Sequence, residues 1–136
     1  MSDAPVPYVL AFLIGDQVIE EAGTKKKTVV GIHDHIGSMV KPVRSDFGIY
    51  ARLADGEGKY KFLIRLANLK TEEPVFDFEV TKDWPKGQTI AEVCINLRGM
   101  PIPDFGKYEL QLFANGVYIG RHVIICMELK PPSKKE

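Results

Sequence analysis

The sequence predicts an all-β protein: an antiparallel, immunoglobulin-like β-sandwich of about eight strands, with at most one short helical turn. Apolar residues alternate with polar ones in short runs, and no segment keeps a helical period. The motif Asp104-x-Gly106-x-Tyr108 has the spacing of a tyrosine corner, in which a phenol at the start of a late strand hydrogen-bonds backwards across a loop. Asn115-Gly116 supplies two residues that tolerate positive φ, as a two-residue type I′ hairpin requires.

The first third of the chain contains two expected strands. Residues 8–14 are nearly all apolar, which is typical of a strand covered on both faces, and Gly15 ends the run. Residues 16–22 can form one short helical turn capped by Asp16, or an irregular segment. Residues 28–36 alternate between apolar and polar side chains, so we expect one continuous strand here.

The middle of the chain is expected to form a connection followed by two paired strands. Residues 37–46, which include Pro42, favour a crossover between the two sheets. Residues 47–53 form the next strand, and the Asp-Gly sequence within residues 55–58 predicts a hairpin. Residues 60–66 form the cleanest amphipathic strand of the protein, because large apolar side chains occupy every second position.

Four further amphipathic strands are expected in the second half, over residues 75–81, 90–97, 108–112 and 118–128. Trp84 falls in an expected loop, because the following proline holds it out of a helical conformation. The strands together predict a single domain over residues 7–129, between a loose N-terminus (residues 1–6) and a polar tail (residues 130–136).

Composition excludes several classes of function. A chain of 136 residues can bury a core without disulfides. Its 18 basic and 18 acidic residues cancel, so no global field draws the protein to nucleic acid or to anionic lipid. The sequence also lacks a Gly-rich phosphate loop and a dinucleotide fingerprint. We therefore expect no nucleic-acid partner, no membrane association and no cofactor.

Two features favour a cytoplasmic location. Cys94 and Cys126 lie in apolar, strand-like runs, which predicts two buried thiols in a reducing compartment. The apolar run at residues 9–14 is too short for a signal peptide and lacks a basic start.

Several stretches resemble a family of short, single-domain bacterial proteins of unknown function. They are Phe12-Leu-Ile-Gly-Asp16-Gln-Val18, Thr24-Lys-Lys-Lys27-Thr-Val-Val-Gly31-Ile-His-Asp34-His-Ile36, Ile49-Tyr-Ala-Arg52-Leu and Gly106-Lys-Tyr108-Glu-Leu-Gln-Leu-Phe113-Ala-Asn. The resemblance extends from residue 8 to about residue 125. It implies a stand-alone bacterial β-sandwich and no assigned activity. Where the family pattern leads us to expect an aromatic residue and an arginine beside the aspartate, this chain has His33 and His35.

His33-Asp34-His35 is the one metal-like cluster in the sequence. On a continuous strand, a His-x-His pattern places both imidazoles on one face, as some zinc sites require. A third ligand is not close in sequence; His122 and the two cysteines are candidates if the fold brings them near. The alternative is that these three residues are ordinary polar strand residues.

Other constellations give weaker signals for chemistry. Asp16, Asp55 and Glu57 can bind calcium if they share one tip of the sandwich, although Asp-Gly-Glu-Gly is more simply a hairpin. No serine lies in a Gly-x-Ser-x-Gly motif, and neither cysteine has a histidine and a carboxylate close in sequence. These observations favour a protein that is not an enzyme.

The best-supported hypothesis is a non-catalytic protein-interaction module that binds another protein or itself. Leu63 and Phe113 fall on the polar-facing side of their strands, and Phe105 falls in a loop. Exposed together, these side chains would form a contact surface, because soluble monomers rarely leave a large apolar patch open. Two alternatives are a metal-dependent hydrolase built on the His-Asp-His motif and a structural subunit of a larger assembly.

Overall fold

The computed structural model describes residues 4–130, which form ten strands and no helix. The strands are β1 (Tyr8–Gly15), β2 (Gln17–Glu20), β3 (Lys27–Val30), β4 (His35–Ser38), β5 (Val43–Ala54), β6 (Gly58–Asn68), β7 (Pro74–Trp84), β8 (Ile90–Ile102), β9 (Gly106–Ala114) and β10 (Val117–Glu128). Within this part of the chain, no helix has the length and hydropathy needed to cross a membrane.

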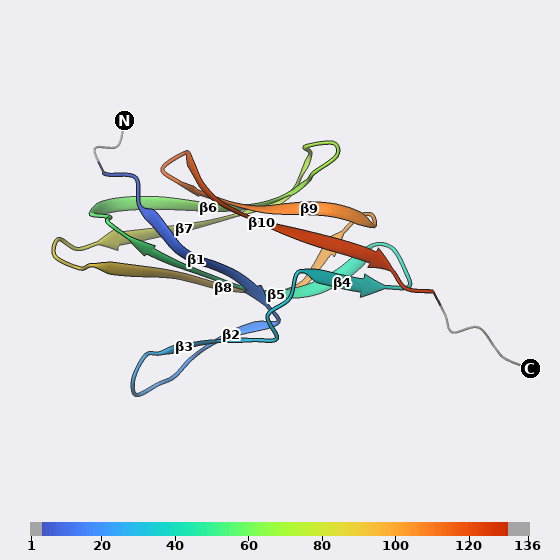
Figure 1. Cartoon of the computed structure of the whole chain (residues 1–136), viewed down its shortest axis with the longest axis horizontal. Coiled ribbons are helices and arrows are strands. Elements are labelled where there is room, and N and C mark those ends of the chain that lie inside the picture. The colour runs from blue at the N-terminus through green and yellow to red at the C-terminus, as the bar shows by residue number, and fades with distance from the viewer. Residues whose placement is uncertain (1–3, 131–136) are drawn as a thin grey trace, which may run out of the picture.

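The strands form two packed sheets and one separate hairpin (Figure 1). One sheet has the order β1-β5-β8, and the other has the order β4-β10-β9-β6-β7, while β2 and β3 pair only with each other. The chain crosses between the sheets from β5 to β6, from β7 to β8 and from β8 to β9, which is the connectivity of an immunoglobulin-like sandwich. The predicted all-β, immunoglobulin-like fold is therefore confirmed.

The core lies between the inner faces of the two sheets. Along β6, Tyr60, Phe62, Ile64 and Leu66 are all buried, while the residues between them face outward. This alternation follows from the two-residue period of a strand, and it is why residues 60–66 gave such a clean signal.

Trp84 corrects one expectation, because it lies in the core and not in a loop. It is the last residue of β7 and is 2% exposed. Its ring centroid lies 5.7 Å from that of Tyr60, and its Nε1 donates a hydrogen bond to the carbonyl of Gln88 at 2.7 Å. Pro85 restricts the backbone conformation of Trp84 but does not determine its burial.

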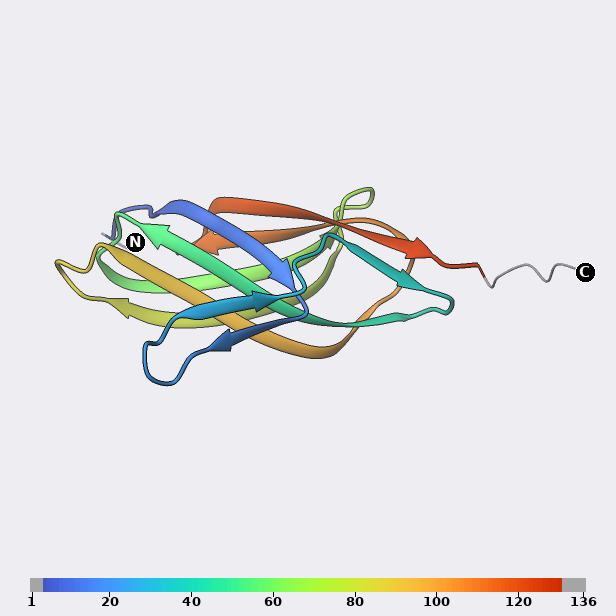
Figure 2. The ribbon, with the colours of Figure 1, turned by 60° about the horizontal axis from the view of Figure 1, so that its bottom comes forward.

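The stretch expected as one strand over residues 28–36 is two strands. Gly31 adopts a φ of 63° and turns the chain between β3 and β4. β4 then pairs in parallel with β10, as the two arrows in Figure 2 show, so one pair of the sandwich is not antiparallel. The segment considered as a helical turn is also a strand, because β2 pairs with β3 from Gln17 to Glu20.

The β2–β3 hairpin lies against the outer face of the three-stranded sheet. The side-chain amide of Asn96 on β8 accepts a hydrogen bond from the Val18 amide at 2.8 Å and donates one to the Val18 carbonyl at 2.9 Å. Gly48 on β5 lies directly beneath the hairpin backbone. A Cβ atom at Gly48 would lie 2.5–2.7 Å from backbone atoms of Gln17, so only glycine allows this approach.

The Gly48→Ala substitution tests this packing. We expect it to lower the free energy of unfolding by about 1–3 kcal/mol, because the added methyl group meets backbone that cannot move aside easily. Gly23→Ala is the matched control: a Cβ at Gly23 has no neighbour within 4 Å. Urea denaturation of both variants measures the difference, and equal stabilities would show that the hairpin does not press on β5.

The tyrosine corner lies where the chain enters β9. Tyr108 is fully buried, and its hydroxyl donates a hydrogen bond to the carbonyl oxygen of Asp104 at 2.8 Å. Burial raises the pKa of this hydroxyl. Gly106 begins β9 with a φ of 135°, a conformation that L side chains rarely adopt.

The turn between β9 and β10 has the geometry that its sequence predicts. Asn115 and Gly116 have φ values of 48° and 82°, as a two-residue hairpin loop requires. The side-chain oxygen of Asn115 accepts a hydrogen bond from the Lys61 amide at 2.8 Å, which ties the turn to the start of β6.

The expected loose ends fall partly outside the described residues, since residues 1–3 and 131–136 are not described. The segment that precedes β1 is held by the domain. Ala4 packs against the core, and Pro5 accepts a hydrogen bond from the Tyr60 hydroxyl at 2.6 Å through its carbonyl oxygen.

Tyr108→Phe should lower the free energy of unfolding by about 0.5–1.5 kcal/mol, because it removes one buried hydrogen bond and leaves the Asp104 carbonyl without that donor. Tyr8→Phe removes a hydroxyl from a residue that is 64% exposed and serves as the control. Chemical denaturation compares the two, and a loss no larger than that of the control would mean that the corner adds no stability.

Candidate functional site

The outer face of the five-stranded sheet carries a small apolar cluster. Leu63 on β6 and Phe113 on β9 are direct cross-strand partners, and both side chains point away from the core and are half-buried. The Phe113 ring lies 5.4 Å, centroid to centroid, from the ring of Tyr118 on β10, which is 47% exposed. We call Leu63, Phe113 and Tyr118 the outer-face cluster.

A cation borders this cluster on the β6 side. The Arg65 guanidinium lies 5.7 Å from the centroid of the Phe113 ring, within the range of a cation–π contact. Its Nε donates to the Asp77 carboxylate on β7 at 2.7 Å, and this pairing lowers the pKa of Asp77. The arginine is thus fixed in place beside the cluster.

A buried carboxylate fixes the cluster on its other side. Glu109 on β9 is 6% exposed, although it points to the outer face. Its Oε1 accepts hydrogen bonds from the Tyr118 hydroxyl at 2.9 Å and from the Gln111 amide at 3.0 Å, and Arg121 lies 3.4 Å from Oε2. Burial, together with the neighbouring Glu109 carboxylate, raises the pKa of Tyr118 to about 12.

Glu109→Gln should lower the pKa of Tyr118 part of the way from about 12 towards its ordinary value of 10.0, because the negative charge beside the hydroxyl is removed. An NMR titration of the tyrosine Cζ signals, assigned with Tyr118→Phe, measures the change. Because the pKa of Tyr118 is higher in the folded protein than its ordinary value, the Tyr118 hydroxyl contributes fully to stability below about pH 10. This contribution is lost as the pH rises through about 12. An unchanged titration midpoint would contradict the contact.

The structure separates Phe105 from the other two residues expected in the apolar patch. Phe105 directly precedes β9, whereas Phe113 lies near the far end of that strand. Phe105 is half-buried against the core, with the Lys41 ammonium 5.3 Å from its ring centroid. Tyr118, and not Phe105, packs against Phe113 in the outer-face cluster. Sequence reasoning missed Tyr118, although the Asn115-Gly116 turn sets the register that pairs it with Phe113.

The structure does not bring His33 and His35 together as a metal site. The break at Gly31 leaves His33 between β3 and β4, where its Nε2 lies 3.4 Å from Asp16 and its buried Nδ1 has no hydrogen-bond partner among the described residues. His35 instead contacts Asp34. Across residues 4–130, no group of three or more His, Cys, Asp or Glu side chains is placed to hold a metal ion.

The proposed calcium tip is also wrong, because its residues lie at opposite ends of the sandwich. β1 pairs antiparallel with β5, so Gly15 lies beside Gly48 while Tyr8 lies beside Ala54. Asp16 directly follows Gly15 and so lies at the end of the sandwich where Gly15 pairs with Gly48. Asp55 directly follows Ala54 and so lies at the opposite end, where Ala54 pairs with Tyr8. The φ of 62° at Asp55 shows that this residue serves a turn.

Neither cysteine is placed as a nucleophile. Cys94 is half-buried and Cys126 is buried, and both are free thiols. Burial raises the pKa of Cys94, and it raises the pKa of Cys126 to about 11. A raised thiol pKa leaves little of the reactive thiolate at neutral pH.

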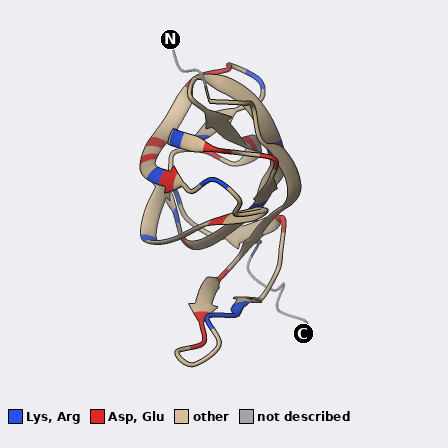
Figure 3. Cartoon of the chain, turned by 90° about the vertical axis from the view of Figure 1, so that its left-hand side faces the viewer, with Lys and Arg blue, Asp and Glu red and all other residues tan. Residues whose placement is uncertain are grey.

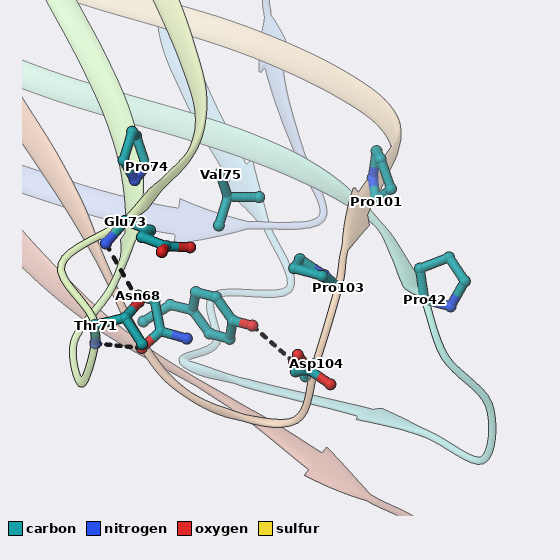
Figure 4. A pocket seen from close by; sticks show the side chains of 10 residues that line it. Pro42, Asn68, Thr71, Glu73, Pro74, Val75, Pro101, Pro103 and Asp104 are labelled. Carbon is teal, nitrogen blue, oxygen red and sulfur yellow. Dashed lines mark hydrogen bonds between the residues drawn. The ribbon is translucent and has the colours of Figure 1, made fainter.

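A further hollow lies at the end of the sandwich where β6 ends and β9 begins (Figure 4). It is a cavity of about 400 Å³, which we call the proline pocket. Its lining consists of Pro42, Asn68, Thr71, Glu73, Pro74, Val75, Pro101, Pro103, Asp104 and Tyr108. Sequence reasoning missed this pocket, because its four prolines come from three segments that are far apart in the sequence.

A smaller hollow of about 200 Å³ adjoins the proline pocket. The two share Asn68 and Pro74 in their linings, and the second hollow also reaches Arg65, Glu109 and Gln111 beside the outer-face cluster. One surface therefore runs from the cluster, over the end of β6, to the proline pocket.

Basic and acidic residues do not gather in separate patches in the described part of the chain that Figure 3 shows. In the view of Figure 3, Lys and Arg positions are interspersed with Asp and Glu positions around the sandwich. The equal numbers of basic and acidic residues agree with this distribution. Among the described residues seen in this view, the basic positions do not form a continuous stripe.

Comparison with known proteins gives a family and likenesses to solved structures. A solved structure similar to this chain is an immunoglobulin-like protein from Pseudomonas aeruginosa, with 12% sequence identity and a TM-score of 0.42; the alignment covers 90% of this chain and 98% of that one. No curated protein sequence matches the chain. A family model described as "Family of unknown function (DUF6941)" matches residues 10–125, which confirms the expected resemblance to a family of unknown function. Because that match spans most of the sequence, the chain belongs to this family of unknown function.

Proposed function

We propose that this domain is a non-catalytic binding module that presents the outer face of its five-stranded sheet to a protein partner. The observation that supports the proposal is the outer-face cluster, in which a leucine and two aromatic side chains meet on a sheet face outside the core. The β2–β3 hairpin, in contrast, covers part of the outer face of the opposite sheet, where Asn96 bonds to Val18.

The composition and rigidity of this face suit a protein interface. Aromatic residues and arginine are enriched at the centre of interfaces, and a polar rim surrounds them. Here Arg65 and Arg121 border the cluster, and Glu109 holds the Tyr118 hydroxyl. A side chain that is already fixed loses less conformational entropy on binding, so Tyr118 can contribute more of its contact energy.

We further propose that the module acts in the cytoplasm of a bacterium. The free thiols of Cys94 and Cys126 suit a reducing compartment, and the sequence resembles short bacterial proteins. A partner there is a second protein or a second copy of this chain.

The double variant Leu63→Ser/Phe113→Ser should remain folded and lose binding. We expect it to abolish self-association, or the binding of a purified partner first identified by affinity capture, because the apolar contact at the centre of the face is removed. Tyr8→Ser/Leu10→Ser is the matched control, since these two exposed apolar residues lie on β1 of the other sheet.

Sedimentation velocity and binding titration of the purified partner measure the effect, and circular dichroism checks the fold of both variants. The proposal fails if the variant on the outer face binds as the wild type does. It also fails if the β1 control loses binding to the same extent.

A further inference from the structure

We propose that the proline pocket binds an arginine side chain of a partner polypeptide. The inference rests on the proposed function in one respect only, namely that the occupant belongs to a protein. Three observations carry it: rigid apolar walls, a carboxylate without a partner, and a surface that continues from the pocket towards the outer-face cluster.

The walls are formed before any ligand arrives. Four proline rings line the pocket: Pro42 before β5, Pro74 at the start of β7, Pro101 in β8, and Pro103 between β8 and β9. A proline ring fixes its own backbone φ and presents a flat apolar face. The Tyr108 hydroxyl is already bonded to the Asp104 carbonyl. The pocket therefore needs no rearrangement to accept an apolar stem.

One negative charge, on the exposed side chain of Glu73, has no partner among the described polar groups of the pocket. The Asp104 carboxylate is paired with the Lys41 ammonium at 3.0 Å. The Glu73 amide donates to the Thr71 hydroxyl, but the Glu73 carboxylate has no ion pair or hydrogen bond among residues 4–130. Figure 4 shows this carboxylate directed from the β6–β7 turn towards the space in front of the prolines. An anion beside apolar walls favours a cation with an apolar stem.

Arginine fits this combination better than lysine. Its planar guanidinium pairs with a carboxylate through two parallel hydrogen bonds, and it is more weakly hydrated than an ammonium group. Its aliphatic stem can lie along the proline rings. The volume of about 400 Å³ is near the lower end of ligand pockets, which span roughly 300–1,000 Å³, so it suits a single side chain.

The neighbouring surface favours a polypeptide over a free small cation. The proline pocket and the hollow beside it share Asn68 and Pro74, and the second hollow reaches Arg65 and Gln111. Residues that flank a bound arginine would therefore lie over the end of β6 and approach the outer-face cluster. A free alkylguanidinium ion would leave this surface unused.

An amide-detected NMR titration of the full chain with the peptide acetyl-Gly-Arg-Gly-amide tests the assignment. We expect saturable shifts at Asn68, Thr71, Glu73 and Val75. Glu73→Gln should weaken binding about tenfold, because a charge-assisted pair is lost. Glu72→Gln is the matched control: it removes the same charge one residue away, from a side chain that lines the adjoining hollow and not the pocket. It should change the affinity less than about twofold.

Several results would overturn the inference. These are the absence of saturable shifts at the pocket, equal binding of the neutral citrulline peptide, and equal effects of Glu72→Gln and Glu73→Gln. Propylguanidinium binding as tightly as the peptide would show that no polypeptide is required. If the variant Lys134→Ser/Lys135→Ser shows shifted pocket signals without peptide, the occupant of the pocket is the chain's own tail and not a partner.

Peptide binding should be unchanged in Leu63→Ser/Phe113→Ser. A failure of the pocket proposal can therefore be distinguished from a failure of the outer-face cluster proposal.

Discussion

The hydrogen bond from the Tyr108 hydroxyl to the Asp104 carbonyl fixes the point at which the chain leaves the three-stranded sheet and enters β9. The side chains of β9 alternate from that point, so Leu110 and Leu112 enter the core while Glu109 and Phe113 reach the outer face. A slip of one residue would exchange the two sets. The same bond therefore helps to hold the register that places the core side chains and the outer-face cluster, and it fixes the Tyr108 wall of the proline pocket.

The two outer faces of the sandwich are used differently. On the three-stranded sheet, Gly48 and Asn96 receive the β2–β3 hairpin, and Lys27 of that hairpin pairs with Glu92 on β8 at 3.3 Å. That face is partly covered by the chain itself. The five-stranded sheet keeps an apolar centre, with Glu109 buried beneath it and cations at its border. This asymmetry is the physical basis for assigning binding to one face and not to the other.

Local signals made much of the fold predictable. The tyrosine corner, the Asn115-Gly116 turn and the alternation of β6 each depend on residues that are close in sequence. The remaining features depend on distant pairing: β2 is fixed by Asn96, and β4 by the parallel β10. For the site, the period of two placed Leu63 and Phe113 on the outer face. The two-residue period could not predict the position of Phe105, because this residue lies in a connection between strands. It also could not predict that the four prolines come together in the folded chain.

Photo-cross-linking tests the central claim most directly. The photoreactive residue p-benzoylphenylalanine is incorporated in place of Phe113, at the centre of the outer-face cluster, and separately in place of Tyr8 on the other sheet. Both proteins are irradiated in living cells and their adducts are resolved by mass. The account predicts one discrete protein adduct, either a partner or a second copy of the chain, from position 113 and none from position 8. Adducts from position 8 alone, or equal adducts from both positions, would contradict it.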